Sequence, residues 1–143
     1  MTDWTFQDKP FEITEEIKNS SVKGFVYLIT NKITDRKYIG LKTLFKEVKL
    51  PPLKGKTRKR KVIKETDWKK YYGSSEWLKK DIEEFGKENF KREILHFGNS
   101  KSELNYLEIK EQIEREVLLT DEYYNNIVNV RINGNHLKGF RND

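Results

Sequence analysis

The chain has 143 residues, a length typical of one domain, and contains no apolar stretch of about 18 residues, the length that would span a membrane. It has no cysteine, which excludes disulfide bonds and thiolate zinc sites and fits a reducing cytoplasm. The formal net charge is +6 and 36% of the residues are charged, which predicts a well-solvated surface around a small, aromatic-rich core.

Residues 1–23 form a mixed leader that lacks the basic and then apolar order of a secretion signal. Within it, residues 11–18 fit either a short helix or an edge strand. Residues 24–41 follow as two β-branched and aromatic runs around a polar turn, which predicts a hairpin. Each strand of this hairpin carries a tyrosine, Tyr27 in the first and Tyr38 in the second.

Residues 42–66 show no clean periodicity and contain two prolines and a glycine, so we expect a long basic loop or ribbon. Residues 42–70 hold twelve lysines and arginines against three acidic residues, a balance of +9, and the rest of the chain sums to −3. Binding to phosphates releases their counterions, so this segment predicts a nucleic-acid partner. The alternative is a run of surface charges that only keeps the protein soluble.

Residues 67–73 predict a short helical turn, and Ser74 and Ser75 begin a helix that ends at Gly86. The apolar stripe of this helix consists of Trp77, Leu78, Ile82 and Phe85. Four aromatic residues of this region fit either a small core or a surface that stacks on bases: Trp68, Tyr71, Tyr72 and Trp77.

Residues 89–97 alternate well enough to predict a third strand, on which one face carries Phe90, Arg92, Ile94 and His96. We expect Ser102 to cap a helix over residues 103–119 whose buried face is formed by Tyr106, Ile109, Ile113 and Val117. Residues 127–130 predict a short buried strand, and residues 131–143 a flexible C-terminal tail. The order β-β-α-β-α predicts an α+β fold with a small, mostly antiparallel three-stranded sheet flanked by helices.

Several short motifs occur in a fixed order along this framework. Gly24-Phe25-Val26-Tyr27 and Tyr38-Ile39-Gly40 precede the basic stretch, a helix led by Gly73-Ser74-Ser75, a glutamate on a later helix and a final asparagine. In this ordered set the chain resembles the GIY-YIG endonucleases, a family of DNA-cutting enzymes named after the two tripeptides. The resemblance implies a nuclease domain over residues 24–130 with a basic insert at 42–66.

The resemblance implies that Tyr27 helps to activate the attacking water and that Tyr38 assists around the scissile phosphate. A free phenol has a pKa near 10 and is a poor base at neutral pH, so nearby cations or a metal-bound hydroxide would have to favour the phenolate. Alternatively, both residues are ordinary strand tyrosines, each with a polar hydroxyl at the end of an apolar ring.

Glu108 is the candidate ligand for a divalent cation, Mg²⁺ or Mn²⁺, because the family's metal-binding glutamate lies early in the last long helix. Mg²⁺ is typically held by one or two carboxylates together with waters and the substrate's phosphate. Glu111 is the second choice. Asn125 matches the asparagine near the family's active site or, alternatively, ends the helix in the left-handed conformation, and Asn126 competes with it.

The family also places an arginine near the phosphate, where its guanidinium grips two oxygens. Counting back from Gly73 gives Arg60, and a small register error would select Arg58. A histidine that some members carry has no match here, since His96 and His136 lie far along the chain. We expect DNA contacts from eight residues: Lys42, Lys56, Arg58, Lys59, Arg60, Lys61, Lys69 and Lys70.

The resemblance therefore implies a free-standing, Mg²⁺-dependent DNA endonuclease of phage or homing type, located in the cytoplasm of a bacterium or a phage-infected cell. A non-catalytic nucleic-acid-binding module on the same fold is the alternative, and a structure-specific repair nuclease is a third reading. A single small domain that both reads and cuts DNA predicts weak sequence preference or recognition as a homodimer.

Overall fold

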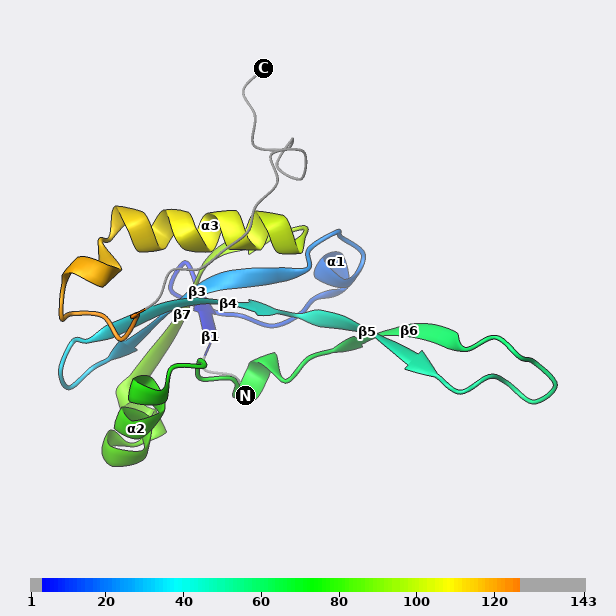
Figure 1. Ribbon diagram of the computed structural model, residues 1–143, viewed down its shortest axis with the longest axis horizontal. Helices are drawn as coiled ribbons and strands as arrows, with labels where there is room; N and C mark the ends of the chain where they lie inside the picture. Colours follow the sequence, from blue (N-terminus) through cyan, green and yellow to red (C-terminus); the bar gives the residue numbers. More distant parts are fainter. Residues whose placement is uncertain (1–3, 127–143) are drawn as a thin grey trace, which may run out of the picture.

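The computed structural model describes residues 4–126 and shows a central sheet with helices on both of its faces (Figure 1). Along the sheet the strand order is β2-β1-β7-β3-β4. Its strands are β1 (Trp4–Phe6), β2 (Lys9–Pro10), β3 (Gly24–Asn31), β4 (Lys37–Thr43) and β7 (Phe90–Gly98). A separate two-stranded ribbon consists of β5 (Phe45–Leu50) and β6 (Arg60–Glu65). The helices are α1 (Glu15–Lys18), α2 (Glu76–Phe85) and α3 (Lys101–Glu114), with 3₁₀ turns η1 (Trp68–Lys70), η2 (Lys87–Asn89) and η3 (Val117–Leu119).

The α+β class is confirmed, but the expected three-stranded antiparallel sheet is wrong, because the sheet has five strands and is mixed. The leader supplies the difference, since β1 pairs in parallel with β7. Three residues are too few for an alternating pattern to be visible in the sequence. What holds β1 in place is Trp4, a fully buried ring whose centroid lies 4.9 Å from that of Phe25 and 5.4 Å from that of Tyr27.

Two hydrophobic layers cover the sheet, and strand β3 separates them. Phe25, Tyr27 and Ile29 face the layer that contains Trp68 and α2, whereas the residues between them face α3. A strand covered on both faces reads as a continuous apolar run, as β3 does. None of the helices within residues 4–126 has the length and apolar character needed to span a bilayer.

Helix α3 differs from its predicted form at both ends and in its buried face. Ser100, not Ser102, accepts the capping hydrogen bond from the backbone of Glu103, and the helix ends at Glu114. The expected stripe is wrong at Tyr106, which is 36% exposed, and at Ile113, which is 61% exposed, whereas Val117 is buried as expected, in the turn after the helix. The sheet instead buries Leu104, Leu107 and Gln112. Apolar side chains surround much of this helix, so the sequence pattern alone does not select the face.

A β-bulge corrects the predicted face of β7. Tyr27 lies opposite Ile94 but Val26 lies opposite His96, so one extra residue enters β7 at this point. His96 therefore joins the face covered by α3, where its Nε2 lies 2.8 Å from Glu111 Oε1, and it does not share the face of Ile94.

The predicted hairpin of residues 24–41 is confirmed as β3 and β4, with Tyr27 opposite Gly40 and Ile29 opposite Tyr38. Of the two alternatives for the basic segment, the structure shows the ribbon. The helix predicted after Ser74 is confirmed as α2, with Ser75 as its cap. The strand expected at residues 127–130 and the tail at 131–143 lie outside the described residues.

Candidate active site at the edge of the sheet

Tyr27 lies directly over Gly40 of the neighbouring strand. A Cβ atom added at residue 40 would be 2.3 Å from the Tyr27 hydroxyl oxygen and 2.6 Å from its Cζ atom. Gly40 is therefore required for space, not for an unusual backbone angle. The Tyr27 side chain is only 1% exposed, and its ring centroid lies 6.2 Å from that of Tyr38 and 6.0 Å from that of Tyr71.

Tyr38 reaches further toward solvent and pairs with Ser74. The two hydroxyl oxygens are 3.2 Å apart, so one donates a hydrogen bond to the other. Gly73 permits this approach, because its φ of +93° is one that residues with a Cβ rarely adopt. The turn before α2 thus places a second hydroxyl beside the hairpin phenol.

A pocket of about 410 Å³ opens at this edge of the sheet, between β4, α2 and α3. Its lining combines hydroxyl, carboxyl and amide groups: Tyr38, Ser74, Ser75, Glu76, Trp77, Glu108, Gln112, Asn125 and Asn126. The structure thus brings Tyr38, Glu108 and Asn125 together from distant parts of the chain. Tyr27 lies beneath the pocket and does not line it.

The Glu108 carboxyl is half-buried, and burial raises its pKa to about 7, with Lys101 opposing the shift. A carboxyl group that is kept from water in this way favours either a proton or a metal cation. Glu111, the second choice, is engaged elsewhere. Burial acts to raise its pKa, but hydrogen bonds from Arg115 and His96 outweigh burial and hold the pKa below its ordinary value.

Both hairpin phenols are protonated at neutral pH. Burial raises the pKa of Tyr27 well above 10, and Tyr71, Tyr38 and Glu108 raise it further. Burial also raises the pKa of Tyr38, against a lowering by the hydrogen bond with Ser74. Without a bound cation, the site therefore presents neutral hydroxyl groups that donate and accept hydrogen bonds, and the phenolate required of a general base is disfavoured.

Asn125 completes the edge of the sheet. Its Oδ1 accepts a hydrogen bond from the Ile39 backbone N–H at 3.0 Å, and its Nδ2 donates to the Ile39 carbonyl at 2.8 Å. The residues before Asn125 also pair with β4 through its first residue, Lys37. The Lys37 N–H donates to the Glu122 carbonyl, and the Tyr124 N–H donates to the Lys37 carbonyl. Asn125 therefore acts as a side-chain substitute for a further strand.

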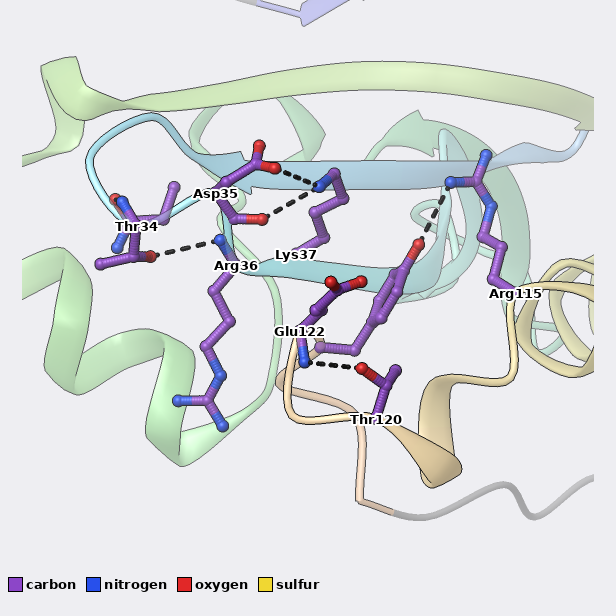
Figure 2. Close-up of polar contacts among 9 residues, drawn as sticks. Thr34, Asp35, Arg36, Lys37, Arg115, Thr120 and Glu122 are labelled. Atoms are coloured by element: carbon purple, nitrogen blue, oxygen red, sulfur yellow. Dashed lines mark hydrogen bonds and ion pairs between the residues drawn. The ribbon is translucent and has the colours of Figure 1, made fainter.

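Figure 2 shows the region that leads into this edge contact. Lys37 is anchored by Asp35, whose carboxylate lies 3.2 Å from the Lys37 ammonium, and the Glu122 N–H donates to the Thr120 hydroxyl at 3.2 Å. The Arg115 guanidinium donates to the Tyr123 hydroxyl at 3.4 Å. The segment after α3 is thus fixed against the start of β4, which places Asn125 at the pocket.

Removing this edge contact is expected to destabilise the protein. Asn125→Ala leaves the buried N–H of Ile39 without its partner, so we expect a loss of about 2 kcal/mol in the free energy of unfolding, measured in urea. Asn126→Ala is the control, because Asn126 is exposed, and it should change stability by less than about 0.5 kcal/mol. Equal stability of the two variants would contradict the role given to Asn125.

A family model described as "Putative endonuclease segE, GIY-YIG domain" matches residues 4–128, which is most of the chain. The chain belongs to the GIY-YIG endonuclease family. No curated protein and no solved structure gives a significant match. The family match begins at Trp4, the first described residue, which agrees with the incorporation of β1 into the sheet.

The GIY-YIG domain does not bring either expected arginine to the pocket. Arg58 and Arg60 lie at the far end of the ribbon, where the Arg60 Nε donates to the Pro51 carbonyl at 3.4 Å. Arg36, which sequence reasoning missed, lies beside one of the residues that line the pocket. Its guanidinium carbon lies 4.4 Å from the Tyr124 ring centroid and 5.9 Å from that of Trp77, a residue that also lines the pocket.

Lys42 is a cation that the fold places beside Tyr71, the tyrosine whose ring packs against that of Tyr27. It lies on the same face of β4 as Tyr38 and Gly40, with its ammonium 4.2 Å from the centroid of the Tyr71 ring and 2.6 Å from an Asp67 carboxylate oxygen. Buried Arg92 fixes this region, since its guanidinium donates to the Tyr71 carbonyl at 2.8 Å. The aromatic residues that fitted either a core or a base-stacking surface do not behave alike: Trp68 is fully buried in the core, whereas Trp77 is 49% exposed.

The donor set of the pocket fits a single hard cation held mainly by the substrate and water. Within residues 4–126 no group of three histidine, cysteine, aspartate or glutamate side chains is arranged to hold a metal ion. Glu108 is the half-buried carboxylate of the pocket, Glu76 lies at its exposed rim, and Gln112 and Asn126 add amide oxygens. One or two carboxylates with neutral oxygen ligands is the pattern typical of Mg²⁺.

Proposed function

We propose that this GIY-YIG domain is a DNA endonuclease that hydrolyses phosphodiester bonds with the help of Mg²⁺ or Mn²⁺ held by Glu108. The observation that supports the proposal is the convergence of Tyr38, Ser74, Glu108 and Asn125 around one pocket at the edge of the sheet. The half-buried Glu108 carboxyl, whose pKa burial raises to about 7, is suited to a cation because binding compensates the charge that burial disfavours.

Hydrolysis joins a water oxygen to phosphorus, breaks one P–O bond and moves a proton from the water to the leaving oxygen. A divalent cation would supply charge stabilisation at the phosphoryl group. The hydroxyl groups of Tyr38 and Ser74 would donate hydrogen bonds to the phosphate or the water. Tyr27, buried below them, holds Tyr38 in position, and Asn125 fixes the strand that carries it.

Lys42 takes the place that the family gives to arginine in this proposal. An ammonium is a point charge and lacks the fork of a guanidinium, so it stabilises negative charge without orienting two phosphate oxygens. The ion pair with Asp67 restrains Lys42 close to the aromatic cluster. We infer that this arrangement supports slower or less geometrically selective cleavage than a bidentate arginine would.

Relaxation of supercoiled plasmid tests the proposal. We expect nicking with Mg²⁺ or Mn²⁺ and none with EDTA, and Tyr38→Phe should slow nicking about 10²-fold, because one preorganised hydroxyl is lost. Tyr106→Phe is the matched control, since this partly exposed tyrosine does not line the pocket, and it should nick like the wild type. DNA binding without metal-dependent nicking would instead show a non-catalytic nucleic-acid-binding module.

A further inference from the structure

The ribbon formed by β5 and β6 projects from the body of the protein (Figure 1). Within residues 4–126 its strands pair only with each other, from Phe45 opposite Glu65 to Leu50 opposite Arg60. An isolated pair of strands is marginally stable in water because neither face is packed. Apart from Phe45 at its root, which packs against the core, the ribbon contributes little to the core, which favours a role in binding.

The positive charge of the protein lies on this ribbon and on the loop that joins its two strands. Residues 45–65 contain nine lysines and arginines against two glutamates, a net charge of +7, whereas the rest of the chain sums to −1. Among residues 4–126, one ion pair involves a cation of the ribbon, with the Lys61 ammonium 3.6 Å from the Glu47 carboxylate. Most of the charge is thus available to a polyanionic partner.

The two faces of the ribbon differ in charge. Residues that lie opposite each other share a face, so one face carries the pairs Lys46 with Lys64, Val48 with Val62, and Leu50 with Arg60. This first face has three cations and no acidic residue, and we call it the cationic face. The opposite face carries the pairs Phe45 with Glu65, Glu47 with Ile63, and Lys49 with Lys61. Its two positive and two negative charges cancel, and we call it the neutral face.

The neutral face is turned toward the body of the protein. A hollow of about 650 Å³ lies between the root of the ribbon and residues 18–23, and four of the five ribbon residues that line it belong to the neutral face: Phe45, Glu47, Ile63 and Glu65. Lys46, at the root, is the fifth. At the root, the cationic face apart from Lys46 is therefore directed away from residues 18–23.

We propose that the cationic face lies in the major groove of duplex DNA and holds the duplex against the pocket at Glu108. The major groove is about 12 Å wide and admits a two-stranded ribbon. Each strand of six residues spans roughly 20 Å at about 3.3 Å per residue, so the ribbon is long enough to follow the groove. Lysines and Arg60 would contact the phosphates, and the central valines would contact thymine methyl groups.

The connection to the site is direct. A single residue, Leu44, separates β4 from β5, and Leu44 is fully buried. The strand that carries Tyr38 and Lys42 therefore continues into the ribbon through a fixed point in the core. This inference rests on the proposed function in that DNA is taken as the substrate, but it concerns the binding of DNA and not its cleavage.

Two double variants with the same loss of charge separate the faces. In EDTA, which prevents metal-dependent cleavage, we expect Lys46→Gln with Lys64→Gln to weaken binding of a 30-bp duplex about tenfold and to reduce the slope of log K against log salt by about 2. Lys49→Gln with Lys61→Gln should change the affinity less than about twofold, because these two lysines lie on the face whose charges cancel and Lys61 is paired with Glu47; for Lys61 this replaces the DNA contact expected from the sequence. Fluorescence anisotropy over a salt series measures both, and circular dichroism checks that each variant is folded.

Protection of guanine N7 from methylation tests the groove, because this atom lies in the major groove. We expect protection by the wild type and by the Lys49 and Lys61 variant, and loss of protection in the Lys46 and Lys64 variant. Equal effects of the two double variants, or equal affinity for single strands without N7 protection, would overturn the inference. If both ribbon variants bind DNA normally and the plasmid is still nicked, this inference fails and the proposed function stands. If the wild type binds in the groove but nicks no plasmid, the proposed function fails and this inference stands.

Discussion

Glu108→Gln is expected to lower plasmid nicking by about 10³-fold or more and, at the same time, to stabilise the metal-free protein at pH 8. The loss of activity follows because a bound cation contributes several kcal/mol of charge stabilisation, and each 1.36 kcal/mol corresponds to about tenfold in rate. The gain in stability follows from the environment of the carboxyl group, which is half-buried and lies next to a polar pocket.

The sign of the stability change depends on pH. Burial raises the pKa of Glu108 from 4.5 to about 7 in the folded protein, so the folded state binds a proton more tightly than the unfolded chain. Stability is therefore lost as the pH rises from about 4.5 to about 7, and the loss is complete above pH 7. A shift of this size corresponds to about 3 kcal/mol, which partial solvation reduces to about 1 to 2 kcal/mol.

Urea unfolding of both proteins in EDTA measures this difference. Glutamine does not titrate, so the two proteins should be equally stable near pH 4 and differ by the full amount at pH 8. Adding Mg²⁺ at pH 8 should then stabilise the wild type and not the variant, because the cation binds only the folded site. The control is Glu114→Gln, an exposed position on α3, which should show neither effect. A wild type that Mg²⁺ does not stabilise would contradict Glu108 as the ligand.

Local sequence patterns were sufficient for the parts of the fold that depend on near neighbours. The hairpin of β3 and β4 follows from two β-branched runs around a polar turn, and the start of α2 follows from the Ser75 cap. The resemblance to the family, and not a local pattern, selects Tyr38, Glu108 and Asn125, and the structure gathers them around one pocket. Their chemical roles stay predictions, because geometry alone does not measure catalysis.

Long-range contacts decided what the patterns missed. Nothing within residues 4–6 indicates a parallel pairing with β7, which depends on the burial of Trp4 against β3. The position of His96 depends on a bulge that shifts the register of two distant strands. The arginine assignment relied on counting through residues 42–66, and the ribbon formed there carries Arg58 and Arg60 away from the site.

The second large effect is expected at Gly40, where the family's second tripeptide ends. Gly40→Ala places a methyl group 2.3 Å from the Tyr27 hydroxyl oxygen, in a buried position where the tyrosine ring is enclosed by aromatic neighbours. Such overpacking typically costs about 1 to 3 kcal/mol, and the ring must move to relieve it. Because Tyr27 packs against Tyr38, we expect nicking to fall about 10²-fold, since small misplacements of catalytic groups cost this much.

A double-mutant cycle with Tyr27→Leu identifies the cause. Leucine removes the hydroxyl and the outer ring atoms that the new methyl group would meet, so Gly40→Ala should cost at least about 1 kcal/mol less in the leucine background than in the wild type. Urea unfolding of the four proteins gives this coupling energy, and Tyr27→Phe should give less relief, because Cζ would still lie 2.6 Å from the methyl group. If Gly40→Ala costs the same in every background, the contact with Tyr27 is not what requires glycine. Such a coupling would explain why the second tripeptide ends in glycine. The backbone at residue 40 would accept any residue, but the Tyr27 ring leaves no space for a side chain there.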